Sequence, residues 1–190
     1  MKKALISFAV AAISFVTPAF AEVSSYDVVK HKSLVRFFAI QNGAPVEGRF
    51  DEYTMDIKFS PDDVENSKIV VEIDMASLRT AREDVSTNLK LPEWLSTELF
   101  PKAKFVSKKI NRTPSTNNYY ADGDLTLRGK TMPVTINFQM EDLINKDFAL
   151  AKGSATLHRL DFGVGQGEWA DDKVIKNEVR VDFRIVAKKQ

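Results

Sequence analysis

The chain has no cysteine among its 190 residues, which excludes disulfide bonds, thiol chemistry and cysteine-ligated metals. It has only two histidines, His31 and His158, whereas imidazole metal sites usually need two or three with a suitably spaced carboxylate. An excess of one charge is also missing, because 27 basic residues stand against 26 acidic ones. Nucleic-acid-binding domains normally carry a basic excess. We therefore expect a fold held by apolar burial, a partner other than nucleic acid, and structural or surface roles for both histidines.

Residues 1–21 predict a cleavable secretory signal peptide. Lys2 and Lys3 precede an apolar run from Leu5 to Val16, and Ala19-Phe20-Ala21 fits a small-x-small cleavage site. The run is shorter than the roughly 18 to 20 apolar residues of a membrane span. Cleavage would leave residues 22–190 as one exported domain, with 27 − 2 = 25 basic residues. The short basic start favours a bacterial periplasmic protein.

The stretch Tyr119–Met140 alternates apolar and polar residues on both sides of Gly129-Lys130. This period of two predicts a long antiparallel hairpin with one apolar face. Similar alternation predicts strands within residues 26–29, 33–41, 46–60, 67–75, 103–110, 148–159 and 174–187. The apolar parity changes inside 46–60, which predicts a bulge or bend near Asp51-Glu52.

Residues 76–99 lack this alternation and contain helix formers, so we expect short helical pieces and loop there. The fold class that follows is all-β, with about eight antiparallel strands that close most simply as a barrel. The helical segment is expected to lie over one barrel end as a lid, with Trp94 and Leu95 pointing inward. An eight-stranded barrel is either filled by side chains or able to hold one slender ligand.

Several short motifs occur together in a fixed order. They are Ser33-x-Val35-x-Phe37, Val46-x-Gly48-x-Phe50, Ser77-Leu78-x-Thr80, Phe100-Pro101-x-Ala103-x-Phe105, Gly123-Asp124-Leu125-Thr126-Leu127-x-Gly129 and Leu160-Asp161-Phe162-Gly163-Val164-Gly165. With these motifs the chain resembles the YceI-like family of bacterial periplasmic lipid-binding proteins, over almost all of residues 22–190. The resemblance implies an extended lipocalin-like barrel that holds a long isoprenoid or fatty-acyl lipid and carries out no established reaction.

Two further stretches, Leu91-Pro92-Glu93-Trp94 and Gly165-Gln166-Gly167-Glu168-Trp169, resemble the branch found beside cytochrome b561-type membrane proteins. That likeness implies a quinone-like isoprenoid and a membrane redox partner. It leaves the oligomeric state open, a homodimer included. Val85 and Ser86 stand where many members carry Arg-Asp, and Gln41 or Asn42 where many carry His, so polar contacts at the cavity mouth are not carried over.

The candidate ligand-binding residues are the apolar side chains expected to face the barrel axis or its lid. The 13 phenylalanines against 4 tyrosines favour a hydrocarbon cavity over a packed core made of the same residues. The candidates are Val35, Phe37, Phe50, Ile69, Val71, Ile73, Leu89, Trp94, Leu95, Phe105, Leu125, Leu127, Val134, Ile136, Phe138, Phe162, Val181 and Phe183.

Two alternatives stay open at this point. Glu168, Asp171 and Asp172 cluster near Trp169, and a carboxylate pair beside an aromatic ring could cleave a sugar or a lipid. A filled barrel could instead serve as a structural partner of a membrane redox complex. Gly163, Gly165 and Gly167 are better explained by tight turning than by phosphate binding, because a strand follows them instead of a helix. No cofactor beyond the lipid and no metal is expected.

Overall fold

A computed structural model describes residues 23–142 and 147–190. The predicted signal peptide, residues 1–21, lies outside the described residues. Eleven strand segments form one sheet, with a single α-helix among the described residues, α1 (Glu83–Lys90). The strands are β1 (Ser24–Val28), β2 (Leu34–Gln41), β3 (Ala44–Phe50), β4 (Tyr53–Phe59), β5 (Lys68–Asp74), β6 (Leu78–Thr80), β7 (Lys102–Arg112), β8 (Asn118–Leu127), β9 (Lys130–Asp142), β10 (Phe148–His158) and β11 (Glu178–Lys189).

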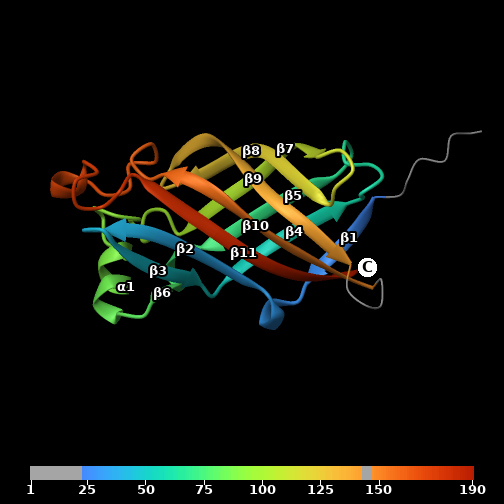
Figure 1. Cartoon of the computed structure of the whole chain (residues 1–190). Coiled ribbons are helices and arrows are strands. Elements are labelled where there is room, and N and C mark those ends of the chain that lie inside the picture. The colour runs from blue at the N-terminus through green and yellow to red at the C-terminus, as the bar shows by residue number, and fades with distance from the viewer. Residues whose placement is uncertain (1–22, 143–146) are drawn as a thin grey trace, which may run out of the picture.

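The sheet closes into an eight-stranded antiparallel barrel in the order β1-β4-β5-β7-β8-β9-β10-β11, with β11 pairing back to β1 (Figure 1). The remaining strands, β2, β3 and β6, extend the sheet from β11. The three extra segments arise because β1 and β2, β3 and β4, and β5 and β6 are consecutive pieces of three bent strands. Counted that way, the chain is an up-and-down barrel of eight long strands, as the alternating sequence predicted.

The kinks fall where the sequence interrupts its alternation. Asp51-Glu52 separates β3 from β4, so the bend predicted from the change of parity is confirmed. The 3-10 turns η1 (Lys30–Lys32) and η2 (Met75–Ser77) make the other two breaks. Each bend redirects a strand without ending its contribution to the barrel.

Two hairpin tips are two-residue turns with left-handed backbone. Asn42 and Gly43 have φ of 48° and 78°, and Arg128 and Gly129 have φ of 49° and 73°. Positive φ at both positions is the geometry that matches the twist of the flanking strands. Arginine is an unusual residue for this conformation, so the tip of β8–β9 is conformationally costly.

Two expectations about element boundaries were wrong. Residues 76–99 were expected to lack strand, but β6 lies there and pairs with β3 through Gly48, Arg49 and Phe50. Three residues are too few for a period of two to be visible. The last strand begins at Glu178 and not at Val174, because the preceding residues wrap around the Arg159 side chain at the barrel end.

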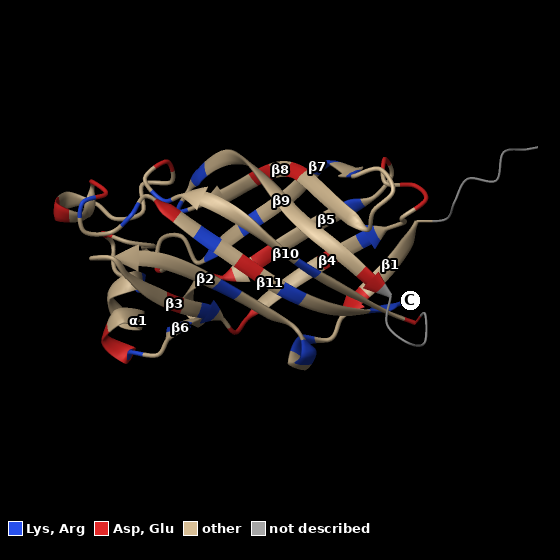
Figure 2. Cartoon of the chain, viewed as in Figure 1, with Lys and Arg blue, Asp and Glu red and all other residues tan. Residues whose placement is uncertain are grey.

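The helix α1 begins with Glu83 and Asp84 and ends with Lys90, charges that complement the helix dipole. Pro92 follows and disfavours helical backbone at Leu91. No helix among the described residues is both long and apolar enough to span a membrane. Acidic and basic residues are interspersed along the strands and loops of the barrel (Figure 2).

Candidate functional site

The barrel encloses a cavity of about 390 Å³, within the usual size range of small-molecule sites. All eleven strand segments and α1 contribute lining residues. The lining is almost entirely apolar, and its few polar side chains include Gln41, Asn88 and Arg159. Such a space suits a hydrocarbon, and it is not the filled barrel that the structural-partner alternative required.

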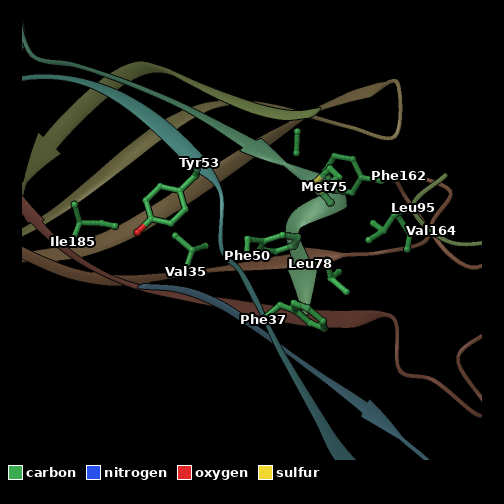
Figure 3. Close-up of a cluster of buried hydrophobic side chains, with 11 residues drawn as sticks. Val35, Phe37, Phe50, Tyr53, Met75, Leu78, Leu95, Phe162, Val164 and Ile185 are labelled. Carbon is green, nitrogen blue, oxygen red and sulfur yellow. The ribbon is translucent and has the colours of Figure 1, made fainter. Parts of the chain in front are cut away.

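All eighteen candidate ligand-binding residues line this cavity, although contact with a ligand stays a prediction. Strand residues among them are Val35, Phe37, Phe50, Ile69, Val71, Ile73, Phe105, Leu125, Leu127, Val134, Ile136, Phe138, Val181 and Phe183, and loop or helix residues are Leu89, Trp94, Leu95 and Phe162. Figure 3 shows how side chains from β2, β3, η2, β6 and two loops converge in one buried cluster that includes Phe37, Phe50 and Leu78. The candidate residues did not include Met55 and Ile57, which also line the cavity. Their parity on β4 could have identified them as inward-facing.

The cavity stays open partly because three phenylalanine rings lie across glycines. Phe37 of β2 faces Gly48 of β3 in the ladder, and an ideal Cβ on Gly48 would lie only 2.3 Å from the Phe37 ring. The same close approach occurs between Phe105 and Gly123 at 2.6 Å and between Phe183 and Gly153 at 2.5 Å. Each ring occupies the space of a missing side chain, as in aromatic rescue of strand glycines. The rings therefore rest against the barrel wall instead of filling the axis.

Phe59 at the end of β4, Tyr119 at the start of β8 and Phe138 of β9 form an aromatic cluster. These strand ends lie on the side of the barrel away from α1 (Figure 1). The Tyr119 ring stacks on Phe138 at 5.3 Å between centroids and meets Phe59 edge-on at 5.1 Å. All three side chains are buried. Offset and edge-on contacts of this kind add to the apolar burial. Phe59 and Phe138 also line the cavity.

The other end is covered by α1, residues 91–101 and residues 159–177, and we call this end the mouth because we expect a ligand to enter there. Val85 and Leu89 of α1 line the cavity together with Trp94 and Leu95, so the helical segment covers this end as expected of a lid. The backbone N–H groups of Gly165 and Gln166 both donate to the Glu93 carbonyl, at 3.0 and 2.9 Å. These bonds join the two mouth loops to each other.

Arg159 organises the second mouth loop, and sequence reasoning missed it. Its side chain is 3% exposed, and its nitrogens donate to five backbone carbonyls, those of Val164, Trp169, Asp171, Ile175 and Lys176. A guanidinium has five N–H donors, so all are used. Burial lowers the Arg159 pKa, while the charges of Asp171 and Asp172 act in the opposite direction.

The guanidinium also explains two neighbouring features of the mouth. It lies 5.8 Å from the centroid of the Trp94 ring, which packs against Trp169 at 5.6 Å. Gly165 has φ of +81°, and an ideal Cβ there would lie 2.3 Å from Arg159 Nη1. Only glycine fits this position without moving the buried cation. No period in the sequence marks Arg159, because its partners are backbone carbonyls of a loop.

The carboxylates of the hydrolase alternative do not form a site in the cavity. Glu168, Asp171 and Asp172 are exposed on the mouth loop, and none lines the cavity. A backbone N–H of Lys173 and its ammonium, 3.0 Å away, lower the Asp171 pKa. A general acid needs the opposite shift. Within residues 23–142 and 147–190, no group of three histidine or acidic side chains is placed to hold a metal ion.

Fold and cavity together define a lipocalin-type barrel with an apolar interior. The chain belongs to the YceI-like domain family, whose model matches residues 26–187. It is 34% identical over 125 residues to a UPF0312 protein of Pseudomonas savastanoi pv. phaseolicola, covering 63% of this chain and 64% of that protein. A UPF0312 protein of Photorhabdus laumondii is 31% identical over 93 residues, covering 49% of this chain and 47% of the relative. The chain thus spans about half to two thirds of these curated relatives.

Solved structures share the architecture. BcnA of Burkholderia cenocepacia matches with a TM-score of 0.80 and 30% identity, over 85% of this chain and 100% of that one. A polyisoprenoid binding domain from Saccharophagus degradans, implicated in plant cell wall breakdown, matches with a TM-score of 0.62 and 14% identity, over 90% and 100% of the two chains. At that identity the second likeness shows the fold alone.

Proposed function

We propose that this protein binds a long isoprenoid or fatty-acyl lipid inside its barrel and acts as a carrier or sequestering protein. The observation that carries the proposal is the apolar cavity, which has an aromatic cluster at one end and is covered by α1 and two loops at the other. A structure of the same fold is described as a polyisoprenoid binding domain, which supports the choice of ligand class.

The energetics favour recognition of a chain over recognition of a polar group. Each buried methylene contributes about 0.8 kcal/mol, whereas a net hydrogen bond contributes roughly 0.5 to 1.5 kcal/mol. Few polar side chains line the cavity, and the Arg159 donors are already used by the backbone. Affinity should therefore rise with chain length until the cavity is full.

The setting of this activity is also part of the proposal. The apolar run and cleavage pattern of residues 1–21 support export to the periplasm. The Trp94 and Trp169 stretches are the basis for a quinone-like lipid and a cytochrome b561-type partner, and this rests on analogy. We assign no catalytic step, because the carboxylates of the mouth loop lie outside the cavity.

The test is Ile136→Trp, a volume change inside the cavity. Ile136 lies on β9 between Val134 and Phe138, and all three line the cavity. In a lumen reserved for ligand, the larger ring takes up ligand space, so bound lipid should fall while the urea midpoint of the delipidated protein changes little. In a packed core, overpacking would cost about 1 to 3 kcal/mol. Lipid content after organic extraction and urea unfolding measure the two effects.

Gln139→Trp is the matched control, because Gln139 is an exposed residue of the same strand. It should retain its lipid. Unchanged lipid content in well-folded Ile136→Trp would show that Ile136 does not line the binding site. A large drop in midpoint, with no lipid in either protein, would remove the physical basis of the carrier function.

A further inference from the structure

Five large apolar side chains are exposed among the described residues, and four of them lie at the mouth. These four are Ile40, Leu91, Leu99 and Val174, with exposed fractions of 37%, 43%, 75% and 37%. The fifth, Tyr120, lies near the start of β8, on the side of the barrel away from α1 (Figure 1). A single exposed apolar residue needs no explanation, whereas a group of them at one end of a molecule marks a surface that meets a partner. We call the four mouth residues the apolar rim.

One side of the apolar rim is fixed by the pairing of β2 with the second mouth loop. Gln41 pairs with Ile175, and both side chains line the cavity. Successive side chains of an extended chain point to opposite faces, so Ile40 and Val174 point away from the cavity. The N–H of Lys176 donates to the Ile40 carbonyl at 2.9 Å and holds this pairing. Strand β2 ends at the same end of the barrel as α1 (Figure 1).

The other side of the apolar rim is the loop that follows α1. The N–H of Ser96 donates to the Leu91 carbonyl at 3.0 Å, and the N–H of Leu99 donates to the Ser96 carbonyl at 3.1 Å. Ser96 is buried between the two exposed leucines. Phe100 follows Leu99 and packs on the β8–β9 tip, where an ideal Cβ on Gly129 would lie 2.6 Å from its ring. A hydrogen-bonded turn therefore holds both leucines in solvent.

The two sides of the apolar rim are joined to each other. The Glu93 carbonyl, in the loop of the two leucines, accepts hydrogen bonds from two consecutive N–H groups of the second mouth loop, at 3.0 and 2.9 Å. In that second loop Arg159 donates to the carbonyl of Ile175, the residue after Val174, at 2.8 Å. The apolar rim is thus preformed around the mouth, and a partner that binds there would not have to order either loop.

The charged residues beside the apolar rim are of both signs. Lys90 and Lys176 each adjoin one side of the rim, and Glu93 and Glu98 lie in the loop of the two leucines. None of these four residues forms an ion pair within the part of the chain that the structure describes. The head-group layer of a phospholipid bilayer contains phosphate and ammonium groups, so it offers a partner to each sign of charge. Apolar side chains with such charged neighbours are typical of interfacial membrane binding.

We propose that the apolar rim docks on the surface of a phospholipid bilayer, with the mouth facing the membrane. This inference rests on the proposed function and adds the partner from which the lipid is taken or to which it is delivered. A long hydrocarbon chain that crosses water exposes its whole apolar surface, whereas a chain that enters through a docked mouth does not. None of the four rim residues lines the cavity, so docking and lipid binding can be tested separately.

The first experiment measures flotation of delipidated protein with vesicles of phosphatidylethanolamine and a minor share of phosphatidylglycerol. Wild type should float with the vesicles. The double variant Leu91→Ser, Leu99→Ser should bind them about tenfold more weakly, the effect of losing roughly one buried leucine. Tyr120→Ser is the matched control, because it removes the exposed large side chain that lies away from the mouth. This control should bind vesicles as wild type does.

The second experiment follows the transfer of a fluorescent fatty acid from the same vesicles to the protein. If the protein docks, the rate of transfer should rise with vesicle concentration and should be about tenfold lower in the double variant, in line with its weaker docking. When the same fatty acid is added in ethanol without vesicles, the double variant should show the wild-type dissociation constant, because neither leucine lines the cavity.

The outcomes separate docking from lipid binding. Wild type that does not float, or a double variant that takes lipid from vesicles as fast as wild type, would overturn the inference and leave the carrier function standing. Wild-type dimers that dissociate in the double variant, without flotation of either protein, would assign the apolar rim to self-association and overturn the inference as well. If wild type does not bind the fatty acid added in ethanol, the proposed function fails and the inference fails with it.

Discussion

At the residue scale, the size of the cavity depends on where individual phenylalanine rings rest. Phe37, Phe105 and Phe183 each point toward the barrel interior but lie over a glycine. A large side chain thereby supplies apolar wall without filling the axis. The glycines at these positions leave room for the phenylalanine rings beside the barrel wall. A single methyl group added to one of them should therefore push a ring inward and reduce the volume of the cavity.

Gly48→Ala tests this dependence. The new Cβ would overlap Cε1 and Cζ of the Phe37 ring at 2.3 and 2.4 Å, so the ring must move toward the lumen. Bound lipid should fall, and the free energy of unfolding should decrease by about 1 to 3 kcal/mol from overpacking. Adding Phe37→Leu should restore lipid content, because the smaller side chain no longer meets the methyl group. Undiminished lipid in Gly48→Ala, determined by organic extraction, would contradict the account.

Tyr53 provides a pH-dependent contribution to stability. Its side chain is buried, and burial raises the pKa of the phenol above its ordinary value of 10.0. As pH rises, the Tyr53 phenol therefore loses its proton in the unfolded chain at a lower pH than in the folded protein, which still keeps it. The contribution is complete below about pH 10 and is lost as pH rises toward the folded-state pKa. The free energy of unfolding, measured with urea at about pH 8 and about pH 11, should fall less with rising pH for Tyr53→Phe than for wild type. Equal decreases in the two proteins would refute this role.

The inward-facing residues could be predicted from sequence because a strand alternates strictly. Ile69, Val71 and Ile73 share a parity that one line of sequence reveals. The direction of the Phe37 ring could not be predicted, because it depends on Gly48 in the next strand. The role of Arg159 could not be predicted either, because the positions of its five carbonyl partners depend on the path of a loop.

At the scale of elements, the mouth consists of two loops joined by hydrogen bonds and one short helix with little buried surface. The loop that holds Glu93 is joined to the Arg159 loop by two backbone hydrogen bonds. By contrast, α1 is two turns long, and Ser86 is its one buried residue. Short helices gain most of their stability from packing, so α1 should open more readily than the strands.

Hydrogen exchange should report this difference. Amides of α1 (Glu83–Lys90) should exchange much faster than those of β11 in delipidated protein, because lids come from the least stable segments. Bound lipid should slow exchange in α1, since Val85 and Leu89 line the cavity. Protection of α1 equal to that of β11, and unchanged by lipid, would show that α1 is not a lid.

Element boundaries show where sequence reasoning reaches its limit. The parity change at Asp51-Glu52 revealed a bend because it shifts a long apolar series from one face to the other. The strand β6 has only three residues, and its pairing with β3 depends on the return of the chain after η2. A local period cannot contain that information.

At the scale of the whole molecule, the barrel surrounds one apolar cavity, and its two ends are built differently. An aromatic cluster lies at one end, and α1 and two loops cover the other. Eight strands give a lumen just wide enough for one slender ligand. Sequence pattern alone could not distinguish a hollow barrel from a filled one, because both use the same apolar residues.

Native mass spectrometry of the protein purified from membrane-containing cells is the most direct test of lipid binding. The account predicts a folded population carrying a noncovalent adduct that organic extraction removes and that partitions as a hydrophobic lipid. The extracted protein should take the lipid up again, and Ile136→Trp should carry less of it. Fully folded protein that is free of adduct after expression in lipid-rich cells, and that takes up no prenyl or fatty-acyl lipid when these are added, would contradict the central claim.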